Sequence, residues 1–190
     1  ALTAQGQVPP AIQQGLTVLP GLGAANTPGT NLQAISTIQL SSDPVGTYYV
    51  SATASNVPAA AGGKGGSDVW TGRYNAVTDT LTANLDAAAL NTTGAEFGLS
   101  LHHSGLLAVV DRLPGAPVLA QRASLTQPFV ELGRVTGLPT QSYYDPSLAT
   151  VGGALHLICT FGNNLAMGPV NLTTRVVGTM KVIARPIQAG

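Results

Sequence analysis

The chain has 190 residues, of which only 8% are charged, and its eight basic and eight acidic residues give a formal net charge of zero. This length suits one ordinary domain with a sizeable core. Because there is no basic field to attract phosphates, the composition excludes nucleic acid as the expected partner. No apolar run approaches the roughly 20 residues that a membrane-spanning helix needs, so no membrane span is expected.

The first segment, residues 1–36, is rich in Gly, Pro, Gln and Asn, and it is predicted to be loop with one short strand at residues 16–19. The chain starts ALTAQG, without a charged leader followed by an apolar block, so a secretory signal would already have been removed. The single cysteine, Cys159, lies in the apolar run ALHLICTF and is interpreted as a buried thiol. We expect an exported protein, extracellular or periplasmic, of bacterial origin.

From residue 37 the pattern of apolar and polar residues becomes regular. A short strand, a Ser-Ser-Asp-Pro-Val-Gly turn and a second strand at residues 48–52 predict a hairpin. After a loop rich in Gly and Ala come a third strand at residues 67–74 and a fourth at residues 80–85. A helix over residues 79–90 is the alternative, because its apolar spacing also fits a helix.

The same order of four strands returns twice along the chain. Ser100-Leu101 aligns with Ser147-Leu148, and the region of the third strand aligns almost without gaps in all copies. Four strands per unit at this period are typical of propeller blades. The anchor glycines Gly66, Gly115 and Gly162 stand 49 and 47 residues apart, and the units are residues 37–90, 91–138 and 139–186.

The predicted fold class is therefore all-β, with three visible four-stranded units of a β-propeller. A closed propeller needs about four blades, so the array is incomplete or is completed by a partner. The strand at residues 16–19 could help to close the ring, or a second chain could complete it. Open sheet edges favour self-association. A two-sheet β-sandwich built from the same strands is the alternative fold.

Two short motifs resemble known propeller repeats. Residues 67–73, Ser-Asp-Val-Trp-Thr-Gly-Arg, are similar to the third-strand motif of TolB-like propellers. Residues 145–148, Asp-Pro-Ser-Leu, are similar to the hairpin of that family and to the blade opening of five-bladed glycosidase propellers. The resemblance implies a propeller fold, and it departs from the family pattern where Pro169 replaces the closing Arg and Gly98 replaces the opening Asp.

Candidate acid-base groups are few, because the chain has only eight acidic residues. Glu96 and Asp145 both stand just before a first strand, which in a propeller lines the central funnel, so the two carboxylates are expected to approach one mouth. They could be a catalytic pair for glycoside hydrolysis, ligand-binding groups, or acceptors for loop hydrogen bonds.

Aromatic and histidine side chains supply the other candidates. Tyr143 and Tyr144 beside Asp145 are predicted to form an exposed platform on which a sugar could stack. His102 and His103 stand at a hairpin tip and are further candidate ligand contacts, but their spacing fits no metal motif, and no metal site is predicted. No glycine-rich loop precedes a helix and no nucleophile motif occurs, so no cofactor is implied.

These features predict an extracellular recognition module whose ligand is a glycan or a protein, with carbohydrate preferred. A glycosidase-like propeller enzyme is one alternative, and the sequence leaves open whether the chain is an enzyme. The other alternative is a structural or assembly subunit, since the low charge and the mean hydropathy of +0.25 favour packing against other chains.

Overall fold

The computed structural model describes residues 32–40, 42–55, 57, 59, 62–138, 143–162 and 164–184. For a few strand residues, among them Tyr143 and Tyr144, only the backbone is described. The strand predicted at residues 16–19 lies outside the described residues. No helix among the described residues is long and apolar enough to cross a membrane.

Twelve described strands form three antiparallel sheets of four strands each, and within each sheet every strand pairs with its neighbours in sequence. The first sheet contains β1 (Leu32–Ile38), β2 (Thr47–Ser55), β3 (Ser67–Asn75) and β4 (Thr80–Asn84). The second contains β5 (Ala95–Leu101), β6 (Leu107–Leu113), β7 (Val118–Gln121) and β8 (Val130–Arg134). The third contains β9 (Tyr143–Val151), β10 (Ala154–Phe161), β11 (Asn164–Pro169) and β12 (Lys181–Ala184).

The all-β prediction is confirmed, and helical structure over residues 79–90 is limited to a short 3-10 turn at Ala88–Leu90. β1 begins at Leu32, upstream of the predicted start at residue 37. Its pairing with β2 shifts register between Gln33 and Ile35, and such a bulge interrupts the two-residue alternation by which a strand is recognised.

Turn glycines fix the hairpins where the chain reverses most tightly. Gly152 and Gly153 join β9 to β10 with φ angles of 57° and 79°. Two consecutive residues with positive φ form the turn that matches the twist of a two-residue hairpin, and glycine adopts this conformation without strain. The predicted Gly-Gly turn is therefore present at this place.

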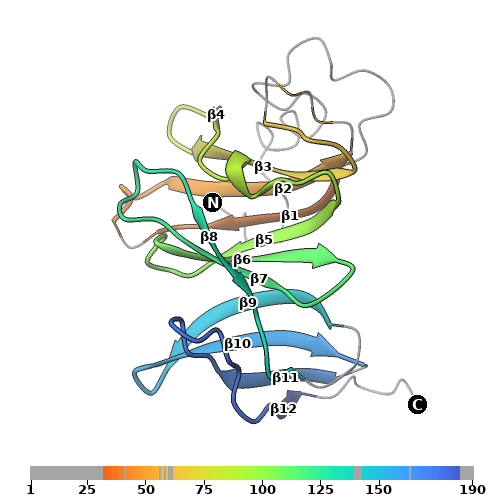
Figure 1. The fold of residues 1–190 in the computed structure, drawn as a ribbon. Helices are drawn as coiled ribbons and strands as arrows, with labels where there is room; N and C mark the ends of the chain where they lie inside the picture. The colour runs from red at the N-terminus through yellow and green to blue at the C-terminus, as the bar shows by residue number, and fades with distance from the viewer. Residues whose placement is uncertain are drawn as a thin grey trace, which may run out of the picture.

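The three sheets follow one another face to face, from the orange and yellow first sheet to the blue third sheet (Figure 1). The first strand of each sheet contacts the first strand of the next, β1 with β5 and β5 with β9. One apolar cluster, which includes Tyr49, Leu99 and Phe129, lies between the first and second sheets, and another, which includes Val109 and Leu157, lies between the second and third. The sheets are consecutive meanders, so the topology does not favour the β-sandwich alternative.

A buried polar network also connects the first two sheets. The Asp86 carboxylate accepts hydrogen bonds from the Tyr49 hydroxyl (2.7 Å) and the Thr71 hydroxyl (2.8 Å), and it forms an ion pair with Arg122. Arg122 Nε donates to the Gly105 carbonyl at 2.6 Å. Burial and the Asp86 charge raise the pKa of Tyr49 well above its ordinary value, so this hydroxyl stays protonated as a donor.

Candidate functional site

The candidate site lies on the seam between the second and third sheets, where β9 begins beside β6. Asp145 is exposed and has a φ of 52°, in the left-handed region that aspartate tolerates better than most residues. Its backbone amide donates a hydrogen bond to the carboxylate of Asp111, which lies in β6. The pairing of β9 with β10 shifts register here, so that Asp145 and Pro146 together stand opposite Cys159. The bulge and the left-handed residue together bring Asp145 against the second sheet.

The two carboxyl groups of this pair have different environments. Asp111 is 5% exposed, and burial raises its pKa above the ordinary value of 3.8. The negative charge of Asp145 raises that pKa further, while the hydrogen bond from the Asp145 amide opposes the rise. Among the described residues no Lys or Arg forms an ion pair with either group. The site therefore holds one buried carboxyl group that binds its proton more tightly than usual and one carboxyl group that is exposed to solvent.

Open space adjoins the buried member of the pair. Asp111 stands opposite Gly98 of β5, so a side chain at position 98 would lie on the same face. A Cβ atom placed on Gly98 would meet no atom of the described residues within 4 Å, apart from those of its two chain neighbours. Cys159 lies close enough to sense the Asp111 charge, and burial followed by that charge raises the pKa of its thiol to about 11. Cys159 is therefore a buried, protonated thiol, as the sequence predicted.

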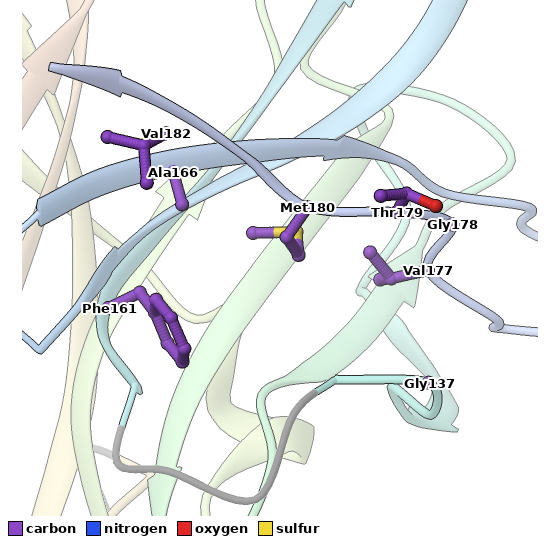
Figure 2. A pocket seen from close by; sticks show the side chains of 8 residues that line it. All are labelled: Gly137, Phe161, Ala166, Val177, Gly178, Thr179, Met180 and Val182. Carbon is purple, nitrogen blue, oxygen red and sulfur yellow. The ribbon is translucent and has the colours of Figure 1, made fainter.

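A pocket of about 460 Å³ lies at the same end of the third sheet. Its lining is mainly apolar, and Figure 2 shows the Phe161 ring and the Met180 side chain, from β10 and from the segment that leads into β12. Phe161 pairs in register with Tyr143, two residues before Asp145. The volume falls in the range of about 300–1,000 Å³ that small-molecule sites occupy. The pocket is thus near the start of β9, where the sequence predicted a ligand platform.

Comparison with known proteins gives a result at the level of fold. No family model matches the chain, and no curated protein matches it. Among solved structures, an α-L-arabinofuranosidase from Podospora anserina in complex with cellotriose aligns with a TM-score of 0.54 and 12% identity, over 88% of this chain and 55% of that one. A GH62 hydrolase in complex with xylotriose aligns with a TM-score of 0.51 and 12% identity, over 83% of this chain and 52% of that one.

Both neighbours are five-bladed β-propellers. The chain has a propeller-type fold. Its three sheets are propeller blades, as the repeats predicted, and the chain spans about half the length of the solved structures that it resembles. The first strands β1, β5 and β9 are the successive inner strands of these blades, which places Gly98 and Asp145 on the inner strands of the second and third.

Glu96, predicted as a partner of Asp145, is fully buried within the second blade. Its carboxylate accepts hydrogen bonds from the Thr92 hydroxyl (2.7 Å) and the Thr92 amide (3.1 Å), and Arg112 Nε lies 3.0 Å from it. Burial raises the pKa of Asp68 in the first blade, and the charge of Glu96 adds to that rise; burial likewise raises the pKa of Asp111, to which the charge of Asp145 adds. The described contacts of Glu96 therefore stabilise a loop, and the carboxyl beside Asp145 is Asp111.

The predicted histidines lie on the same seam. His102 is 6% exposed, and its two ring nitrogens contact the Ser104 hydroxyl and the Thr150 hydroxyl of β9, both at 2.9 Å. Burial, followed by the charge of His103, lowers the pKa of His102. His103 is exposed, and its ring centroid lies 3.9 Å from that of His102. His102 thus bridges two blades, and no group of three potential metal ligands occurs among the described residues.

The backbone of Tyr143 and Tyr144 forms the first residues of β9, so the strand starts earlier than predicted, and their side chains lie outside the described residues. Sequence reasoning missed Asp111. A carboxylate in the apolar strand LAVVDRL was the available signal, because a buried acidic residue needs a partner or a function.

Proposed function

We propose that the chain is a carbohydrate-recognition module whose ligand binds at the seam of the second and third blades. The observation that carries the proposal is the Asp111–Asp145 pair beside the open space at Gly98. Sugar hydroxyl groups donate hydrogen bonds well to carboxylates, and Asp145, which is exposed and forms no ion pair with the described residues, could accept them. Cellotriose and xylotriose in the two similar structures support this ligand class.

The predicted aromatic platform is part of the same proposal. Sugar rings present apolar C–H faces that stack on aromatic side chains, and Tyr143 and Tyr144 immediately precede Asp145 in the sequence. His102 and His103 are retained as candidate contacts at the edge of the seam, with His103 the exposed member of the pair. We propose an extracellular or periplasmic location in a bacterium, where such glycans are available.

Calorimetric titration with xylotriose and with cellotriose tests the proposal. Asp145→Asn keeps the left-handed backbone, which asparagine adopts readily, and removes the charge. A charged hydrogen bond contributes about 1.5–3 kcal/mol, so we expect roughly 10- to 100-fold weaker binding. Asp79→Asn is the matched control, because Asp79 is also exposed, has a φ of 51° and lies in the first blade. Wild type that binds neither sugar, or equal loss in both variants, would overturn the proposal.

A glycosidase is the second candidate function, and the unequal environments of the two carboxyls favour it. A carboxyl kept protonated by burial can donate its proton to the glycosidic oxygen as the C–O bond breaks. A solvent-exposed carboxylate can take a proton from the water that attacks the anomeric carbon. Asp111 would be the acid and Asp145 the base. The sequence-based pair of Glu96 and Asp145 is the competing assignment.

Hydrolysis of p-nitrophenyl α-L-arabinofuranoside separates these assignments. If Asp111 is the acid, Asp111→Asn and Asp145→Asn each abolish turnover, and wild-type activity falls as the pH rises through the raised pKa of Asp111. If Glu96 is the acid, a folded Glu96→Gln variant loses turnover while Asp111→Asn retains it. Sugar binding without turnover by the wild type would leave recognition as the function.

A further inference from the structure

The apolar pocket of the third blade carries this inference, because it lies on the same seam as the proposed sugar site. Val177 and Met180, which line the pocket, also belong to the apolar cluster between the second and third blades. Gly137, on the opposite wall, comes from the segment between β8 and β9 that joins the two blades. The pocket therefore lies on the side of the third blade that faces the second, as Asp111 and Asp145 do.

Cys159 of β10 adjoins both the carboxyl pair and the pocket. Its thiol lies close enough to Asp111 for that charge to add to the effect of burial on its pKa. Its partner in β11 is Ala166, which lines the pocket. Phe161, two residues further along β10, shares a sheet face with Cys159 and also lines the pocket. Two residues of a strand span about 7 Å, so a group attached to a sugar beside Asp111 would reach the pocket.

The lining of the pocket suits an aromatic ring. Figure 2 shows the Phe161 ring and the Met180 thioether beside the same space. Aromatic rings pack favourably on other rings and on thioether sulfur. The Met180 sulfur lies over Gly168, where a Cβ atom would come within 2.7 Å of it, so this placement depends on glycine at position 168.

The size and polarity of the pocket agree with such an occupant. An apolar cavity of about 150 Å³ is enough to bind benzene, so the volume of about 460 Å³ has room for a substituted ring. None of the described lining residues is charged, and a charged group would lose its hydration there without gaining a partner. Val182, on one wall, is 47% exposed, so the pocket is open to a ligand from that side.

We propose that the ligand of this chain is a glycan with an aromatic substituent, and that the pocket holds the ring while the attached sugar lies beside Asp111 and Asp145. Such a ligand combines hydroxyl groups that donate hydrogen bonds to the carboxyl pair with an apolar ring that leaves water on binding. This inference rests on the proposed function, because the pocket receives only the substituent of the sugar that binds there.

Calorimetric titration with phenyl 1-thio-β-xylotrioside and methyl 1-thio-β-xylotrioside tests the proposal, since the sulfur linkage resists hydrolysis and only the ring distinguishes the two ligands. Burial of the ring should make the phenyl ligand bind the wild type roughly 10- to 100-fold more tightly than the methyl ligand. Unsubstituted xylotriose reports on the sugar site alone. Wild type that binds xylotriose but does not distinguish the phenyl and methyl ligands would overturn this inference and leave the proposed function standing. Wild type that binds none of the three would overturn both.

Two tryptophan variants at neighbouring positions of β12 locate the ring. Val182→Trp should fill the pocket from its open side, and aromatic residues are well tolerated in strands. Ile183→Trp is the matched control, because Ile183 is also 47% exposed but is not one of the residues that line the pocket. We expect Val182→Trp to bind the phenyl and methyl ligands equally and Ile183→Trp to keep the wild-type preference. A preference for the phenyl ligand that survives in folded Val182→Trp would overturn the proposal.

The two methionines give a second measurement that does not depend on a variant. Met180 lines the pocket, whereas Met167 of β11 is not part of its lining. In the wild type labelled with ¹³C at the methionine methyl groups, the ring current of the bound phenyl group should shift the Met180 signal. The methyl ligand should leave that signal nearly unchanged, and the Met167 signal should be the same with both ligands. Equal Met180 shifts with the phenyl and methyl ligands would contradict the assignment of the ring to this pocket.

Discussion

Substitution of Arg122 by Met is expected to destabilise the fold strongly, because it breaks the polar network between the first and second blades. The Arg122 side chain is fully buried, and that of Asp86 is 6% exposed. The guanidinium also lies over the Phe129 ring, 4.5 Å from its centroid. Methionine fills much of the volume but leaves the Asp86 charge buried without its cation. Removing one partner of a buried ion pair costs about 3–5 kcal/mol.

That loss corresponds to a Tm roughly 6–20 °C lower for a domain of this size. Differential scanning calorimetry and urea denaturation measure it. Arg73→Met is the comparison variant, because the side chains of Arg73 and its partner Asp43 are 25% and 10% exposed, so losing this partly exposed pair should cost less than losing the fully buried Arg122. Adding Asp86→Asn to Arg122→Met should restore part of the stability. A loss below about 1 kcal/mol in the single variant would show that the network does not hold the blades together.

The remaining predictions concern pH. Because the folded-state pKa of Asp111 is raised, its contribution to stability is present below its unfolded pKa of 3.8 and is lost as the pH rises through the folded pKa. Asp111→Asn should therefore be at least as stable as the wild type at neutral pH, while binding the sugar less well. Urea denaturation midpoints measured from acid to neutral pH test the expected stability, and a clear loss of stability in the variant would refute it. The lowered pKa of His102 has the opposite effect on stability: the free energy of unfolding falls as the pH drops below the ordinary histidine pKa of 6.5. His102→Gln should make this fall smaller, and an unchanged dependence of stability on pH would contradict the reasoning.

The repeat pattern was enough to predict the blades, because turn glycines and alternating apolar residues are local signals. A Gly-Gly pair between two strands, such as Gly152 and Gly153, indicates a hairpin turn. Trp70 and Cys159 are buried, as expected for residues in strands with apolar neighbouring residues. The start of β1 could not be placed in this way, because a bulge near Gln33 breaks the alternation.

Which carboxyl groups lie together in the candidate site depends on contacts between residues far apart in the sequence, and no local sequence pattern indicates these contacts. Glu96 and Asp145 look equivalent in the sequence, since each was predicted just before a first strand; both in fact lie within that strand, near the start of β5 and of β9. Glu96, however, has Thr92 and Arg112 as partners, and Asp145 reaches the second blade only because a bulge opposite Cys159 turns it there. Asp111 looked like an ordinary strand residue, and its importance comes from the blade that packs beside it.

The central claim is that a sugar occupies the open space beside Asp111 and Asp145, and a substitution at Gly98 tests it most directly. Leucine at position 98 would fill that space while both carboxyl groups remain, and Gly98 needs no positive φ that a side chain would strain. Gly98→Ala leaves most of the space open and serves as the control. The proposed site predicts that titration with xylotriose detects binding for the wild type and Gly98→Ala but none for a folded Gly98→Leu variant. Wild-type affinity in Gly98→Leu would contradict it.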